Sequence, residues 1–171
     1  ENAKTDTIDD VEFIFEWLTD HLPVEMRATI IHNDYKYDNV IFDSDSKEIK
    51  SILDWEMCTI GDPRMDLGTA LSYWAENNDG DFEKAFNLSW LKGNLSRNEF
   101  VKEYQKYNNI DLGNILYFYI FGLFKNAIVL QQIYSRYKNG QTQDPRFAQL
   151  IEGVEILFGK AKKSILDQEM R

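Results

Sequence analysis

The spacing of apolar residues changes character near residue 62. Residues 8–23 carry apolar side chains at helical spacing and end in a proline, which predicts a first helix. Three short segments rich in β-branched residues follow at 28–32, 40–43 and 49–53. The last two flank the turn-rich SDSK and predict a β-hairpin, whereas ATIIH predicts a separate strand that leads into the loop before the hairpin.

Beyond this point the strand signal disappears and helix signals take over. Asp62 stands as an N-cap acid before a proline, Ser96 opens a capping-box pattern, and Asn139-Gly140 is typical of a helix end. The predicted helices cover residues 62–74, 96–107, 114–138 and 144–168.

These elements predict an α+β, mainly helical single domain over residues 1–171, with one small β-hairpin surrounded by five or six helices. The apolar stripes of the helices supply one core. The predicted core residues are Phe13, Leu18, Leu71, Trp74, Leu116, Ile120, Leu123, Ile128 and Leu157.

Composition removes several classes of function. The formal net charge is −10 and the pI is near 4.7, which argues against a nucleic-acid partner because phosphate binding needs a basic face. The most apolar run, Ile115 to Phe124, stops at Lys125 and is shorter than the roughly 20 residues that cross a bilayer, so we predict a buried helix and no membrane span. A single cysteine, Cys58, and a polar start without a signal peptide predict a cytoplasmic location.

Candidate chemistry is concentrated in the loop HNDYKYDN. His32, Asp34 and Asn39 give the spacing H-x-D-x-x-x-x-N, and Asp54 follows the second hairpin strand. This is the kinase arrangement, in which a loop Asp is followed five residues later by an Asn and, after a hairpin, by a metal-binding Asp. Taken singly these residues could be structural, since Asn39 could close a turn and Asp54 could cap the residue after it.

Phosphoryl transfer explains why these residue types occur together. Asp34 could accept the proton of an attacking hydroxyl, while Asn39 and Asp54, at the two ends of one hairpin, could supply oxygen ligands to Mg²⁺. Lys36 could place a positive charge on the transferred phosphoryl group. His32 is better explained as a framework residue packed beneath the loop than as a ligand.

At this point the chain resembles a known family. HNDYKYDN together with ILDWEMCTIGDPRMDLG is similar to the aminoglycoside phosphotransferase family, which is related to protein kinases and choline kinases, and most similar to the kinase-like domains associated with acyl-CoA dehydrogenases. The resemblance implies the C-terminal lobe of a protein-kinase-like fold, with Asp34 as catalytic base, Asn39 and Asp54 as Mg²⁺ and ATP-binding residues, and Asp66 bracing the loop. It also implies that Asp62 caps the helix that carries Asp66.

The chain departs from the family pattern in two places. Asn33 stands where many members have glycine, which bears on the shape of the turn. No Gly-rich loop or lysine-bearing strand precedes His32, so we expect this chain to lack the N-terminal lobe that clamps the nucleotide. The chain alone should then fold but be inactive, and it could self-associate through the exposed lobe interface.

The leading hypothesis is thus ATP-dependent, Mg²⁺-dependent phosphorylation of a hydroxyl of a small-molecule alcohol. A non-catalytic kinase-like binding module and an all-helical interaction domain are the alternatives. The acceptor stays open between an aminoglycoside, a choline-like alcohol and a hydroxyacyl thioester. Tyr73, Trp74 and residues 117–124 could line an acceptor pocket, but their helical spacing favours the core.

Overall fold

A computed structural model gives the fold, and it describes residues 3–8, 10–24 and 28–171. Mostly helical, with two small antiparallel sheets, it confirms the predicted α+β class. The helices are α1 (Val11–Asp20), α2 (Pro63–Tyr73), α3 (Asp81–Ala85), α4 (Arg97–Asn108), α5 (Ile115–Lys138) and α6 (Leu150–Asp167). The strands are β1 (Thr29–Ile31), β2 (Val40–Phe42), β3 (Ile49–Ile52) and β4 (Thr59–Gly61).

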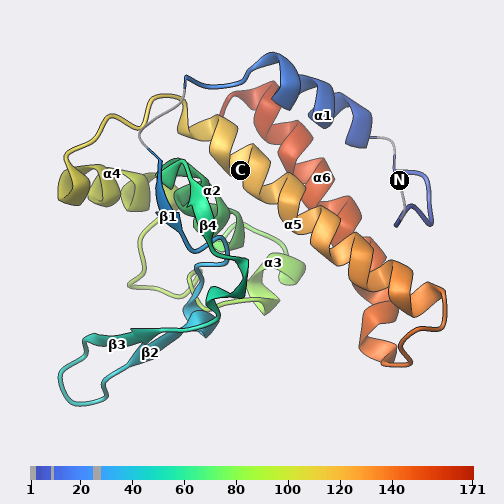
Figure 1. Ribbon diagram of the computed structural model, residues 1–171, viewed down its shortest axis with the longest axis horizontal. Helices are drawn as coiled ribbons and strands as arrows, with labels where there is room; N and C mark the ends of the chain where they lie inside the picture. The colour runs from blue at the N-terminus through green and yellow to red at the C-terminus, as the bar shows by residue number, and fades with distance from the viewer. Residues whose placement is uncertain (1–2, 9, 25–27) are drawn as a thin grey trace.

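The long helix α5 is the centre of the core. It contacts α2 on one side, and α1 and α6 run along it on the other (Figure 1). Its buried stretch includes Tyr119, Ile120, Leu123 and Ala127, each with no exposed surface. Because apolar residues occupy most of its circumference here, α5 is covered on several sides rather than along one stripe.

Two glycines allow α2 and α5 to approach closely. A Cβ atom on Gly68 would lie 2.2 Å from the backbone oxygen of Phe118, and one on Gly122 would lie 2.5 Å from the backbone oxygen of Gly68. Both distances are shorter than any tolerable contact, so only glycine fits at this crossing. The crossing fixes the position of α2, and α2 carries two of the residues that hold the candidate site.

The β-hairpin is confirmed, with β2 paired to β3 in the register Val40↔Ile52. The sequence prediction missed a second sheet, in which β1 pairs with β4 in the register Thr29↔Gly61. The strand β4 has three residues, too few to give a periodic signal. Figure 1 shows the hairpin extending away from the helices.

The capping signals predicted most helix limits correctly. Asp62 accepts a hydrogen bond from the N–H of Arg64 (2.9 Å), the capping box of Ser96 is present at α4, and α5 ends at Lys138. The last helix is different, because Asp144 caps a 3-10 turn at Pro145–Gln149 and α6 begins only at Leu150. The short helix α3 was not predicted.

The predicted core is partly correct. Leu18, Leu71, Ile120, Leu123 and Leu157 are buried, and Leu116 and Ile128 pack against the core. Phe13, which was expected in the core, is exposed, because the buried face of α1 is made by Ile14 and Leu18, and those positions lie one turn apart.

The length argument against a membrane span does not hold. Among the described residues α5 is long and apolar enough to cross a membrane by length and composition, because the helix continues past Lys125. Half of that stretch is buried within the structure, which is also the behaviour of a central core helix.

Candidate active site

The loop between β1 and β2 lies against the first turns of α2 and is held by Asp66. One carboxylate oxygen of Asp66 accepts a hydrogen bond from the N–H of His32 (2.6 Å), and the other accepts one from the N–H of Asn33 (2.5 Å). Two consecutive backbone donors on one carboxylate fix both the position and the direction of the loop. Such charge-assisted bonds are stronger than neutral ones.

Asn33 has a φ of +69°, in the left-handed region. Glycine adopts this conformation without cost and asparagine tolerates it better than most residues. The substitution of Asn for Gly is therefore compatible with the same turn.

His32 is buried beneath the loop. Its Nδ1 accepts a hydrogen bond from the N–H of Asp34 (3.2 Å), so its Nε2 carries the proton and donates it to the backbone oxygen of Leu53 (2.7 Å). The ring thus joins the loop to the end of the hairpin. It also contacts the ring of Trp55, with ring centroids 4.6 Å apart.

The carboxylate of Asp34 receives three side-chain donors. Its Oδ2 accepts from the side-chain amide of Asn39 (2.9 Å) and pairs with the ammonium of Lys36 (3.1 Å). Its Oδ1 accepts from the hydroxyl of Tyr73 (2.8 Å). The structure therefore brings together Asp34, Lys36 and Asn39, which the sequence pattern singled out, and adds Tyr73.

Tyr73 was noted in the sequence only as a pocket or core residue. It is the last residue of α2, two helical turns beyond Asp66, so both side chains lie on one face of the helix. Burial, together with the charge and hydrogen bond of Asp34, raises the pKa of Tyr73 well above its ordinary value. The phenol remains protonated and acts as a donor.

Lys125 is a second residue that sequence reasoning missed. From α5 its ammonium donates to the backbone oxygen of Asn33 and lies 3.3 Å from the side-chain oxygen of the same residue. Burial lowers the pKa of Lys125, while the charges of Asp34 and Asp66 act in the opposite direction. A lone lysine in an apolar helix usually requires a partner, and this was the available signal.

Asn39 and Asp54 lie at the same end of the hairpin, because the N–H of Leu53 donates to the backbone oxygen of Asn39 (2.8 Å). The amide nitrogen of Asn39 is committed to Asp34, which identifies its Oδ1 as the free acceptor; no hydrogen bond to that oxygen occurs within the described residues. Asp54 has a left-handed backbone and makes no side-chain capping bond. One amide oxygen and one carboxylate are a donor set that fits Mg²⁺.

These two ligands are few for a metal site. The described residues contain no group of three His, Cys, Asp or Glu side chains that could hold an ion. Any Mg²⁺ bound by Asn39 and Asp54 would therefore complete its shell with phosphate oxygens and water.

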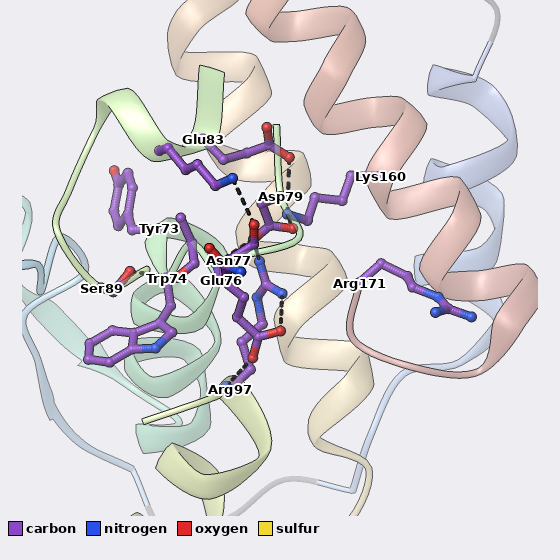
Figure 2. Close-up of polar contacts among 12 residues, drawn as sticks. Tyr73, Trp74, Glu76, Asn77, Asp79, Glu83, Ser89, Arg97, Lys160 and Arg171 are labelled. Atoms are coloured by element: carbon purple, nitrogen blue, oxygen red, sulfur yellow. Dashed lines mark hydrogen bonds and ion pairs between the residues drawn. The ribbon is translucent and has the colours of Figure 1, made fainter. Parts of the chain in front are cut away.

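A buried ionic cluster fixes the segment that follows α2 (Figure 2). Arg97 pairs with Glu76 (3.2 Å) and with Asp79, while Lys160 of α6 pairs with Asp79 (2.8 Å) and Glu83 (3.1 Å). Burial would raise the pKa of Asp79, but the hydrogen bond from Lys160 and the charge of Arg97 outweigh it and lower the pKa. The cluster ties α3, α4 and α6 to the end of α2 next to Tyr73.

Two pockets lie beside Tyr73. One of about 70 Å³ is bordered by Phe82, Phe86 and Leu130. The other, of about 150 Å³, is bordered by Lys36, Trp74 and Phe100. Tyr73 lines both pockets.

The architecture is that of a kinase-like phosphotransferase. A solved structure described as an aminoglycoside phosphotransferase from Ralstonia eutropha JMP134 superposes with a TM-score of 0.76 at 24% identity. The superposition covers 94% of this chain and 51% of that one. At this identity the likeness shows the fold.

Sequence comparison shows the family. The model of the phosphotransferase enzyme family matches residues 1–101, more than half of the chain, and the chain belongs to this family. Acyl-CoA dehydrogenase family member 10 of Mus musculus is 30% identical over 81% of the chain, and family member 11 of Homo sapiens is 30% identical over 73%. The probable acyl-CoA dehydrogenase IBR3 of Arabidopsis thaliana is 27% identical over 74%. The chain spans only 13%, 16% and 17% of these three curated relatives.

Proposed function

We propose that this chain supplies the catalytic base and the Mg²⁺ ligands of an ATP-dependent phosphotransferase that phosphorylates a hydroxyl of a small-molecule alcohol. The observation that supports this most is the Asp34 carboxylate, held on a loop that Asp66 fixes through two backbone hydrogen bonds. A rigidly placed carboxylate is what in-line transfer to a hydroxyl needs, because this chemistry depends on positioning and on charge stabilisation.

In the proposed reaction the acceptor oxygen attacks the γ-phosphorus of ATP and its proton passes to Asp34. The bond from that phosphorus to the bridging oxygen breaks, and ADP leaves with the electron pair. Lys36, now paired with Asp34, is close enough to the base to face a phosphoryl oxygen in the same step. Its ammonium would offset negative charge there.

Asn39 and Asp54 are the residues that would hold Mg²⁺. When bound, the ion would neutralise charge on the phosphate oxygens. The chain's own contribution is to keep the amide oxygen of Asn39 available, because Asp34 occupies its amide nitrogen.

The second candidate is a kinase-like binding module without catalysis. It would explain the fold and the family, and it is favoured by the closed state of Asp34, whose oxygens all carry donors. It does not explain why Asp34, Asn39 and Asp54 are all retained at the spacing that phosphoryl transfer requires.

The relatives suggest where to look for the acceptor. Their names describe acyl-CoA dehydrogenases, so a hydroxylated acyl thioester is the first compound to assay, with choline-like alcohols and aminoglycosides as the other classes. The chain covers about half of the solved phosphotransferase structure, and the assay should therefore use the full-length protein that contains this chain.

The decisive variant is Asp34→Asn, which keeps the size of the side chain and removes the base. We expect turnover to fall by about 10²–10⁴-fold while ATP binding, measured by titration calorimetry, stays near wild type. Asp38→Asn is the matched control, because Asp38 is exposed in the same loop and its side chain makes no hydrogen bond or ion pair within the described part of the chain. Retention of more than a tenth of the wild-type rate by Asp34→Asn would contradict the assignment, and nucleotide binding without any turnover in the wild type would favour the binding module.

A further inference from the structure

The two oxygens of the Asp34 carboxylate differ in how many hydrogen-bond donors they already accept. Oδ2 already accepts from Asn39 and Lys36. Within the described residues Oδ1 accepts only from Tyr73, at 2.8 Å. A carboxylate oxygen accepts about two hydrogen bonds, so Oδ2 is full; because the Asp34 side chain is only 13% exposed, a substrate hydroxyl has to reach Oδ1 at the position that the Tyr73 hydroxyl now holds.

The Tyr73 hydroxyl donates a hydrogen bond to Oδ1, as the hydroxyl of an acceptor alcohol would. It presents a hydroxyl whose proton points at the base, at a distance within the roughly 2.6–3.2 Å that a general base requires. Burial and the charge of Asp34 raise the pKa of Tyr73, so the phenol keeps this proton and stays a donor.

The backbone of Tyr73 is fixed by hydrogen bonds, and the residue borders two pockets. The backbone oxygen of Tyr73 accepts from the side-chain amide of Asn87, and the N–H of Trp74 donates to Leu71 (3.1 Å). Tyr73 also lines two pockets, of about 70 and 150 Å³, which are the space into which a displaced side chain could turn. The ammonium of Lys36 lies 5.1 Å from the ring centroid.

We propose that the Tyr73 hydroxyl occupies the acceptor position on Asp34 Oδ1, that the acceptor alcohol displaces it, and that until then it keeps water off the base. This rests on the proposed phosphotransferase function. Without an acceptor, water bound at Oδ1 could attack the γ-phosphorus, giving its proton to Asp34 and releasing ADP and phosphate. Tyr73 suppresses this hydrolysis because its hydroxyl fills the position of that water.

The kinetic test measures hydrolysis of MgATP by the full-length protein with no acceptor added. Tyr73→Phe keeps the ring and removes the hydroxyl, and we expect the rate to rise about tenfold, the usual weight of a hydrogen bond to a charged group, with an unchanged KM for ATP. Tyr37→Phe is the control, because the Tyr37 hydroxyl donates to Asn94 (3.0 Å) instead of Asp34. A rate in Tyr73→Phe that is equal to or below that of an active wild type overturns the proposal, since a residue that only positions Asp34 would lower hydrolysis when removed.

A crystallographic test separates this inference from the function on which it rests. Crystals of the wild type and of Tyr73→Phe are soaked in ethylene glycol, a probe for any alcohol. We expect a water or glycol oxygen within about 3 Å of Asp34 Oδ1 in the variant; in the wild type we expect the Tyr73 hydroxyl there, or a glycol oxygen with the Tyr73 side chain moved away. An empty position in the variant, or a glycol oxygen on Oδ1 beside an unmoved Tyr73 in the wild type, refutes displacement. If neither protein hydrolyses ATP but the variant binds an oxygen there, the proposed function fails and the role of Tyr73 stands.

Discussion

The helical core and the strands differ in how far they are buried. The helices α2 and α6 pack closely against α5, whereas the four strands in the described part of the chain are mostly exposed. Where α2 crosses α5, Gly68 and Gly122 bring the two backbones into direct contact, and the surrounding side chains are buried. Among the described strand residues Ile31 alone is buried. Eight large apolar residues of the strands and of the turn after β3 are 40–75% exposed, and we refer to them together as the β surface: Ile30, Ile41, Phe42, Ile49, Leu53, Trp55, Met57 and Ile60.

The difference shows how a precise site can be built on weakly buried strands. The strands β1 and β2 are short and, apart from Ile31, not buried, so their packing alone does not fix the candidate loop. It is fixed by side chains from the helical core, namely Asp66 and Tyr73 of α2 and Lys125 of α5. The helices therefore determine both the stability of the fold and the geometry of Asp34.

The crossing of α2 and α5 gives the largest expected effect. Gly68→Ala should lower the free energy of unfolding by at least about 3 kcal/mol, because the added methyl group would meet the backbone of Phe118 and the helices would have to separate. Gly159→Ala in α6 is the matched control, since a Cβ there meets nothing within 4 Å, and it should be neutral or stabilising by up to about 1 kcal/mol. Denaturant unfolding measures both. Equal effects of the two variants would show that the crossing is not the tight point of the core.

Asp66 joins the helical core to the candidate loop, and its substitution gives an intermediate expected loss of stability. Asp66→Asn keeps one acceptor for the loop but turns an amide N–H₂ toward a backbone N–H, so we expect a loss of about 1–3 kcal/mol in stability. Turnover of the full-length protein should fall further, by about 10²-fold, because Asp34 would be displaced. Glu103→Gln is the surface control, as its pair with Lys106 (3.3 Å) is exposed and worth little. Unchanged turnover in Asp66→Asn would mean that the loop is held without this carboxylate.

The sequence predicted the features that depend on neighbouring residues. Helix caps such as Asp62 and Ser96, the end of α5 and the hairpin all have local signals, and the structure agrees with them. The strand β4 and the helix α3 were missed because three and five residues are too short for periodicity. The exposure of Phe13 was missed because a shift of one residue, about 100° around the helix, decides which face of α1 is buried.

As with the fold, the sequence predicted those contacts of the candidate site that join residues close together along the chain. The spacing of Asp34 and Asn39 implied their proximity, and the side chains do meet. Tyr73 lies 39 residues from Asp34, and Lys125 lies 92 residues from its partner Asn33, so only the packing of α2 and α5 brings them to the loop. Contacts of this kind leave no spacing pattern in a single sequence.

The smallest expected effect lies on the β surface and completes the comparison. Ile60 is 75% exposed on β4, and Ile60→Ser in the 171-residue chain should change the free energy of unfolding by less than about 0.5 kcal/mol. Ile31→Ser is the matched variant in the same sheet, because Ile31 is 1% exposed, and it should cost about 3 kcal/mol or more through the lost packing and the buried hydroxyl. Denaturant unfolding at several protein concentrations measures both. A large, concentration-dependent cost for Ile60→Ser would show that copies of the chain cover the β surface, and the contrast between a buried helical core and exposed strands would then not hold in solution.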